Sequence, residues 1–247
     1  MNRLATPRWA VMSAILSPLV LTVGWLVAGR LQPPSYNPIR QTVSVMAGQL
    51  GADRWVMTAA LLAVGACYLI TAAGLRAVGW WARLMLIVAG ACSFGIAASP
   101  EPAAGPSALH LTFTGIGAVM IATWPAAAAW GGPRRHFLLT ARGCATVTAS
   151  FMAMLAWTVV ETHGGTDLGL AERLTASVQT TWPFIVALLL RWPSEPDTGE
   201  EESAPPLLAD APPGQRTMPS GGFRGQGLNG RGADDGGSSS DWPLARS

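Results

Sequence analysis

The sequence predicts an all-α, polytopic membrane protein: a bundle of six transmembrane helices with a short interfacial helix on its outer side. Half of the residues are hydrophobic and only 12% are charged, against about 25% in soluble domains. The apolar residues gather in six runs, each close to the roughly 20 residues that cross a bilayer. Because lipid offers no hydrogen-bond partners, each run must satisfy its backbone amides internally, as a helix does.

The six apolar runs are separated by turns that contain Arg, Pro or Gly. They cover residues 9–29, 55–75, 80–99, 109–130, 144–161 and 174–192. The first run follows Arg3 and Arg8, as a secretory signal would, but it is longer than a typical signal core of about 7–15 residues. It also lacks a small-x-small cleavage site, so we interpret it as a retained helix. The three cysteines lie inside predicted helices without zinc or disulfide spacing, which is typical of small buried side chains.

A polar interruption, PSYNPIRQTVSVMAGQL, separates the first two runs at residues 34–50. Asn37 followed by Pro38 is a favourable helix start, because Asn caps helices and Pro suits the first helical position. Apolar residues then recur at helical spacing, at Ile39, Val43, Met46 and Leu50. This amphipathic helix is too short to span the membrane. We therefore expect it to lie in the outer interface or to fold back over the mouth of the bundle.

The arginines predict the orientation, because cytoplasmic loops are enriched in positive charge. One side carries Arg3, Arg8, Arg76, Arg83, Arg134, Arg135, Arg142 and Arg191, whereas the other carries Arg30, Arg40, Arg54 and Arg173. We expect the richer side to be cytoplasmic, so that both termini lie in the cytoplasm of a multi-pass plasma-membrane protein. The composition contains no Lys and is rich in Ala, Arg and Gly, which is typical of GC-rich bacterial genomes.

The composition changes abruptly at residue 193 to Pro, Gly, Ser and acidic residues. Such a segment cannot bury enough apolar surface to offset the entropy of ordering. We therefore divide the chain into a six-helix transmembrane domain, 1–192, and a disordered cytoplasmic tail, 193–247. The tail is net acidic and could bind a protein partner, although a solvated tail without a partner is the simpler interpretation.

One stretch of the polar interruption, YNPIRQTVS followed by a helix, resembles the signature of a prokaryotic six-helix membrane family catalogued as domain of unknown function 998. GLAER at residues 169–173 and His110, near the start of the fourth apolar run, are similar to the family pattern as well. The family commonly has an acid after the Ser of the signature, where this chain has Val45. The resemblance covers about residues 9–192 and implies the fold, since the family has no settled biochemical function.

Five polar residues expected on the outer side could form a site. They are Glu101, His110, Glu161, His163 and Asp167. His with carboxylates is the ligand set of many divalent metal sites and of proton relays. Because no H-E-x-x-H or other metal motif occurs, we predict no cofactor and keep a divalent metal as an alternative. The simplest interpretation is that these side chains are solvated.

A second candidate set lies in the polar interruption and comprises Tyr36, Asn37, Pro38, Arg40, Thr42 and Ser44. The Arg40 guanidinium suits a planar partner such as the phosphate or carboxylate of a membrane lipid, and an interfacial salt bridge is the alternative. We therefore predict a non-enzymatic protein that binds lipid or a partner at its outer face. A small transporter or channel is the second hypothesis, and an outer-face metal-dependent enzyme is the third.

Two classes of function are disfavoured. No ionisable residue lies at the middle of a predicted span, which argues against a pump with a midplane proton relay. No basic patch interleaved with aromatic residues indicates nucleic acid. The oligomeric state is left open.

Overall fold

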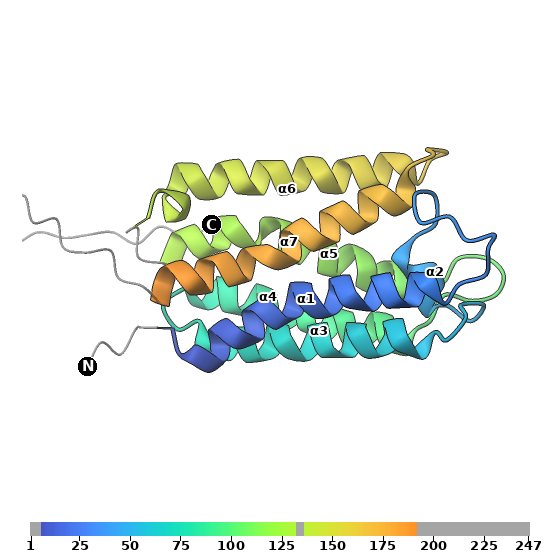
Figure 1. Ribbon diagram of the computed structural model, residues 1–247. Coiled ribbons are helices and arrows are strands. Elements are labelled where there is room, and N and C mark those ends of the chain that lie inside the picture. Colours follow the sequence, from blue (N-terminus) through green and yellow to red (C-terminus); the bar gives the residue numbers. More distant parts are fainter. Residues whose placement is uncertain (1–5, 132–135, 192–247) are drawn as a thin grey trace, which may run out of the picture. The chain divides into compact units, whose positions relative to one another are not determined.

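The computed structural model describes residues 6–131 and 136–191, and every regular element within them is helical. Six long helices run in alternating directions along one another, as Figure 1 shows, and a short helix lies at one end. The elements are α1 (Arg8–Arg30), α2 (Val43–Ala47), α3 (Trp55–Gly74), α4 (Trp80–Ala98), α5 (Ala108–Gly131), the 3₁₀ turn η1 (Phe137–Leu139), α6 (Ala141–Glu161) and α7 (Leu168–Arg191). The predicted tail, 193–247, lies outside the described residues.

Five of the predicted membrane spans are confirmed as helices that are long and apolar enough to cross a membrane: α1, α3, α4, α5 and α6. The sixth long helix, α7, does not belong to this set. It begins at Leu168, six residues before the predicted start at 174. Its middle carries polar residues, of which Gln179 and Thr180 are buried in the bundle.

Small residues let the helix backbones approach closely, as they commonly do between membrane helices. Gly65 of α3 faces Gly90 of α4, and a Cβ added to either would lie 2.9 Å from the carbonyl oxygen of the other. Gly24 of α1 leaves similarly little room beside Ala60 of α3. The α1–α3–α4 side of the bundle is therefore packed backbone to backbone, without space for larger side chains.

Polar side chains inside the bundle bond to backbone carbonyls of neighbouring helices. Ser93 of α4 donates to Leu61 O of α3 at 2.7 Å, and Trp124 of α5 donates to Ala82 O of α4 at 2.7 Å. Gln179 of α7 donates to Phe151 O of α6 at 3.1 Å. Such bonds satisfy groups that would be costly to leave unpaired in an apolar medium, and they fix the register of adjacent helices.

The observed helix α2 is shorter than the apolar stripe that the sequence predicted. The predicted helix start at Asn37 is wrong. The Asn37 Oδ1 atom accepts from the Ile39 amide at 2.9 Å and so closes a turn. The helix begins only after Thr42, whose hydroxyl accepts from the Val45 amide at 3.3 Å. Val43 and Met46 are buried against the bundle, whereas Ile39 and Leu50, the two ends of the stripe, are exposed. Tertiary packing thus uses only the centre of the stripe.

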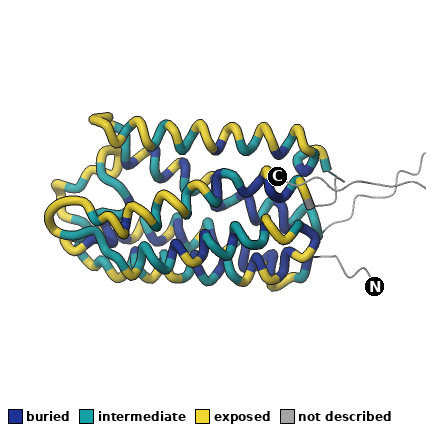
Figure 2. The backbone as a smooth tube through the Cα atoms, turned by 180° about the vertical axis from the view of Figure 1, so that it is seen from behind, coloured by how far each residue is buried: buried dark blue, intermediate teal, exposed yellow. Residues whose placement is uncertain are grey.

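The two ends of the bundle differ. One end, here called the α2 end, carries α2 with its flanking loops, the loop between α4 and α5, and the turn between α6 and α7 (Figure 1). Exposed indoles lie at both ends: Trp55 at the α2 end, and Trp9, Trp80, Trp81 and Trp130 at the opposite end. Figure 2 shows that α6 is the most exposed of the long helices, so it forms an edge of the bundle.

The close contact between α3 and α4 can be tested with Gly65→Leu. The added side chain has no space beside Gly90, and we expect the free energy of unfolding to fall by about 1–3 kcal/mol. Thermal unfolding in detergent micelles measures this change. Gly115→Ala is the matched control, because a Cβ there meets nothing within 4 Å. An equal loss of stability in both variants would contradict the proposed role of the Gly65–Gly90 contact.

Candidate functional site

The segment of residues 36–44, here called the strap, joins the loop after α1 to α2 and docks on the start of α7. Its backbone takes part directly, because the Leu170 amide donates to Ile39 O at 3.0 Å. The two stretches that resemble the family signature, YNPIRQTVS and GLAER, therefore contact each other although more than 120 residues separate them.

Arg173 of α7 is the main attachment of the strap. Only 6% of its surface is exposed. One terminal nitrogen, Nη1, donates to Pro38 O at 2.6 Å, Gln41 O at 2.9 Å and Gly169 O at 2.8 Å. The other, Nη2, donates to the Tyr36 hydroxyl. A planar guanidinium can serve several acceptors in one plane, which a Lys ammonium cannot do in the same way.

Gly169 provides the space for this attachment. A Cβ at this position would lie 2.5 Å from Pro38 O and closer still to Gln41 O. These are the two strap carbonyls that Arg173 binds. Any side chain at residue 169 would therefore push the strap away from α7.

Glu172, the neighbour of Arg173, holds the other end of the strap. Its Oε2 atom accepts from the Val43 amide at 2.7 Å, at the first residue of α2. Burial raises the pKa of Glu172 from its ordinary value of 4.5 to about 7, against the opposing effects of the Val43 amide and of Arg173. Glu101 adds a smaller increase through charge repulsion. Glu172 lies ahead of the apolar part of α7 and in none of the five candidate spans.

Tyr36 is half-buried beside Arg173. Burial raises the pKa of its phenol, and Arg173 acts in the opposite direction. The phenol therefore stays neutral at physiological pH and serves as the acceptor for the Arg173 side chain.

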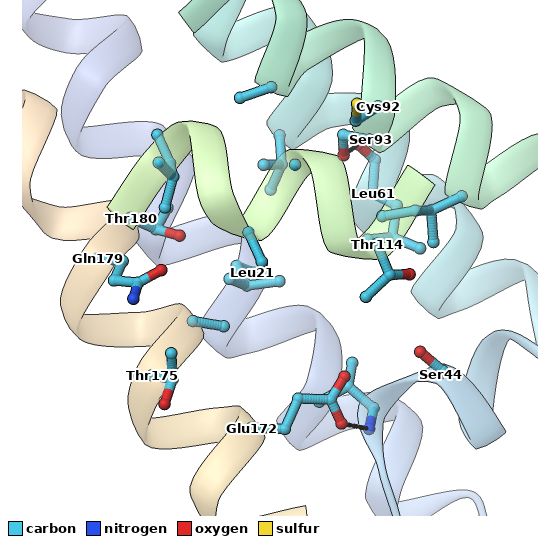
Figure 3. A pocket seen from close by; sticks show the side chains of 18 of the residues that line it. Leu21, Ser44, Leu61, Cys92, Ser93, Thr114, Glu172, Thr175, Gln179 and Thr180 are labelled. Atoms are coloured by element: carbon cyan, nitrogen blue, oxygen red, sulfur yellow. Dashed lines mark hydrogen bonds between the residues drawn. The ribbon is translucent and has the colours of Figure 1, made fainter. Parts of the chain in front are cut away.

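A cavity of about 220 Å³ lies in the bundle beneath the strap, and all seven α-helices contribute to its lining. The wall is mostly apolar. Its polar members are Ser44, Tyr68, Ser93, Thr114, Thr158, Glu172, Arg173, Thr175, Gln179 and Thr180. Figure 3 shows Thr175, Gln179 and Thr180 along α7 on one side, Ser93 and Thr114 on the opposite side, and Glu172 and Ser44 at one end.

Most of these polar groups already have partners inside the protein. The Tyr68 hydroxyl donates to Thr180 Oγ1 at 3.1 Å, and Thr158 and Thr175 share a hydrogen bond of 3.0 Å between their hydroxyls. The cavity therefore offers a chiefly apolar surface, with polar groups concentrated along α7 and at the strap.

The residues predicted in the polar interruption have distinct places in the structure. Tyr36 and Pro38 accept from Arg173, and Thr42 caps α2. Ser44 lines the cavity, while Asn37 closes a turn in the exposed part of the strap. Arg40 is exposed on the strap.

The five predicted outer-side residues do not gather around one point. Glu161 accepts from the Asp167 amide at 2.9 Å and from the Trp157 indole at 3.2 Å, which stabilises the α6–α7 turn. His163 is exposed in this turn, and its Nδ1 atom lies 3.0 Å from Val159 O. His110 is buried at the start of α5, with Nδ1 2.8 Å from Ser99 O. Glu101 accepts through its backbone carbonyl, from the Gln49 amide at 2.8 Å. In the ranges that the structure describes, no three His, Cys, Asp or Glu residues are placed to hold a metal ion.

Sequence reasoning missed the two residues that organise this region, Glu172 and Arg173. Both lie in GLAER, which was recognised only as a weak element of a family resemblance. A charged pair beside an apolar run suggests an exposed helix start, whereas the structure buries Arg173 under a strap from a distant part of the chain.

These features define an all-helical, membrane-type bundle with a mostly apolar cavity beneath the strap. The chain belongs to the family described as "Protein of unknown function (DUF998)", whose family model matches residues 15–189. The match contains both the strap and GLAER, and it confirms the resemblance inferred from these stretches. No curated protein and no solved structure matches the chain.

The raised pKa of Glu172 predicts a pH-dependent stability. In the unfolded chain the Glu172 carboxyl loses its proton near pH 4.5, whereas in the folded protein it keeps the proton up to about pH 7. The folded state therefore binds more protons between these values, and the stabilisation present below pH 4.5 is lost as the pH rises through 7. Glu172→Gln keeps an acceptor for Val43 and removes the ionisation. We expect it to stabilise the protein by roughly 1–3 kcal/mol at about pH 8 and to have little effect at about pH 4.

Thermal unfolding in detergent at both pH values measures the effect of Glu172→Gln. Arg40→Gln, which changes an exposed charge of the strap, should show no such dependence on pH. A gain of equal size at both pH values would show that ionisation of Glu172 is not its cause.

The attachment of the strap can be tested by hydrogen exchange. Arg173→Lys removes the guanidinium group that donates to the strap carbonyls and to Tyr36. Gly169→Ala places a methyl group where the strap carbonyls lie and so displaces the strap. For both variants we expect the amides of residues 36–43 to exchange about 10- to 100-fold faster. Arg40→Lys, at an exposed position of the strap, serves as the control. Unchanged exchange in both variants would contradict the attachment described above.

Proposed function

We propose that the chain is a plasma-membrane protein with six spans, of which α7 is the sixth. At 1.5 Å per residue the 18 residues of its apolar part, 174–191, extend about 27 Å, close to the thickness of the hydrocarbon core. Its polar residues Gln179 and Thr180 are buried, whereas Leu174 and Val178 are exposed. The lower hydropathy of α7 therefore comes from residues that face the bundle, and its outward face is apolar.

In the proposed orientation the α2 end faces outward and both termini are cytoplasmic. The opposite end carries Arg8, Arg76, Arg142 and Arg191, in keeping with the enrichment of arginine in cytoplasmic loops. The exposed indoles at that end suit the headgroup region of a bilayer. Arg40, exposed on the strap, would then face the headgroups of the outer leaflet.

We propose that the protein binds a small amphipathic ligand of the lipid class in the cavity beneath the strap. The observation that carries this proposal is the cavity itself, with apolar walls and polar groups concentrated along α7 and at the strap. Binding pockets for small molecules typically combine an apolar lining with a few placed polar groups. An engineered apolar cavity of about 150 Å³ takes up benzene, so this one has room for roughly nine heavy atoms. Because the cavity is only partly enclosed, the rest of a longer chain would extend out of it.

The strap gives the cavity a cover at the α2 end. Val43 and Ser44, at the start of α2, line the cavity. Glu172 also lines it and accepts a hydrogen bond from the Val43 amide. A ligand would therefore lie beneath a loop whose attachment depends on the neighbouring residues Glu172 and Arg173. Lipid binding, predicted at the outer surface, is thus proposed for the interior of the outer half of the bundle.

A second candidate function is the movement of a small solute across the membrane. Buried hydroxyls continue from the cavity wall toward the opposite end: Tyr68 bonds to Thr180 at 3.1 Å in the wall, and Thr71 bonds to Ser13 at 3.3 Å beyond it. These pairs give the bundle interior more polar character than the sequence indicates. Flux through liposomes that contain the full chain, above that of empty liposomes, would favour this function.

The proposed orientation can be tested by cysteine labelling with a reagent that cannot cross the membrane. His163→Cys at the α2 end should react in intact cells, whereas Arg76→Cys at the opposite end should react only after the membrane is opened. The three native cysteines are buried and should give little background. The reverse pattern of labelling would overturn the orientation.

The proposed ligand class can be tested by photolabelling of the full chain in nanodiscs with a diazirine-bearing decanol. We expect labelled peptides from α5 and α7, which line the cavity. Ala176→Phe fills part of the cavity and should reduce labelling about tenfold. Val178→Phe is the matched control, because Val178 lies two residues away on the exposed face of α7. Equal labelling of both variants and the natural chain would contradict binding in the cavity.

A further inference from the structure

Three buried hydrogen-bond donors beside the cavity have no partner within the described part of the chain. They are Trp25 Nε1 of α1, Thr114 Oγ1 of α5 and Arg173 Nε of α7. All three residues line the cavity. The described residues hold eight buried side-chain polar atoms without a partner, and three of them gather at this one cavity. Each such atom loses its hydrogen bonds to water, so this gathering calls for a common explanation.

Arg173 also brings a buried positive charge to this place. Its terminal nitrogens bond to three backbone carbonyls and to the Tyr36 hydroxyl, and none of these acceptors is a carboxylate. A buried cation without a direct anionic partner is costly. The strap therefore uses the guanidinium as a donor, and no carboxylate of the described residues is hydrogen-bonded to it.

The side chains that carry two of the unpaired donors lie close together. The guanidinium carbon of Arg173 is 5.5 Å from the centre of the Trp25 ring. Trp25 Nε1 and Arg173 Nε therefore belong to two side chains in contact, from α1 and α7. An oxyanion group, whose oxygens can each accept a hydrogen bond, could serve both donors.

The carboxyl group of Glu172, which lines the same cavity, leaves room for an anion beside Arg173 and Trp25. Glu172 is the one carboxylate in the cavity lining, and its Oε2 atom is already engaged by the Val43 amide. Its pKa of about 7 leaves a large fraction of it neutral near pH 7, which lowers the repulsion of a second negative group. The remaining charged and titratable groups that act on Glu172 and Tyr36 are Arg173 and Glu101.

We propose that the Trp25–Arg173 corner of the cavity binds the oxyanion headgroup of a single-chain amphiphile, whose apolar chain occupies the rest of the cavity. This inference rests on the proposed binding of an amphiphile and adds the chemistry of its headgroup. Trp25, Arg173 and Thr114 supply the donors, and Arg173 supplies the charge. A carboxylate and a phosphate monoester share this chemistry.

The test compares three diazirine probes of equal chain length on the full chain in nanodiscs: decanoate, decyl phosphate and decanol. We expect the two anions to label the cavity peptides at about tenfold lower concentration than the alcohol. The relative affinity of decanoate and decyl phosphate then shows whether the site prefers the planar carboxylate or the tetrahedral phosphate.

The decisive variant is Trp25→Phe, which keeps an aromatic ring beside Arg173, removes the N–H donor and makes the side chain smaller; the decanol probe reports the effect of size alone. We expect the affinity for decanoate to fall about 10- to 100-fold, since hydrogen bonds to charged groups are strong. The affinity for decanol should change by less than about threefold. Trp157→Phe is the control, because its indole donates to Glu161 outside the cavity, and it should leave both affinities unchanged.

Two outcomes would overturn the headgroup assignment while leaving the binding of amphiphiles intact. The first is equal labelling of the natural chain by decanoate and decanol. The second is an equal effect of Trp25→Phe on both probes. Absence of labelling by all three probes would instead overturn the proposed ligand class, and the headgroup assignment with it.

Discussion

The attachment of the strap to α7 through the buried guanidinium of Arg173 is the interaction on which the candidate site depends. One side chain binds two carbonyls and one hydroxyl of a loop that lies more than 120 residues earlier in the chain. Gly169 makes room for the approach, and Glu172 holds the start of α2. Without these contacts the loop between α1 and α3 would have no defined place over the bundle. The cavity would then lack the wall that Val43 and Ser44 provide.

The bundle itself is assembled by other means. Between α1, α3 and α4, glycines and alanines bring backbones together, and dispersion contacts at short range supply much of the attraction. Hydrogen bonds such as Gln179 to Phe151 O link other helices of the bundle. The cavity lies between both groups of helices, because residues from all seven α-helices line it.

The hydrophobic pattern predicted five spans to within about three residues at each end, because the apolar runs and the lengths of the spans obey the same physical requirement. It was less successful for α7, where polar residues face the interior and lower the mean hydropathy. Periodicity failed for the short helix α2 in a different way. Ile39 and Leu50 fit the stripe but are exposed, because the Asn37 turn and the Thr42 cap set the helix limits locally.

By itself the sequence determined the helical class, five of the spans and the membership of a family, since each follows from local composition or from short contiguous motifs. It also contained YNPIRQTVS and GLAER as separate stretches. Only the tertiary structure decided that these stretches meet, that Arg173 rather than Arg40 is the buried arginine, and that Glu101, His110, Glu161 and His163 have different neighbours. The reason is physical: hydrogen bonds and burial depend on which helices pack side by side, and residues far apart in the chain carry no local signal of that choice.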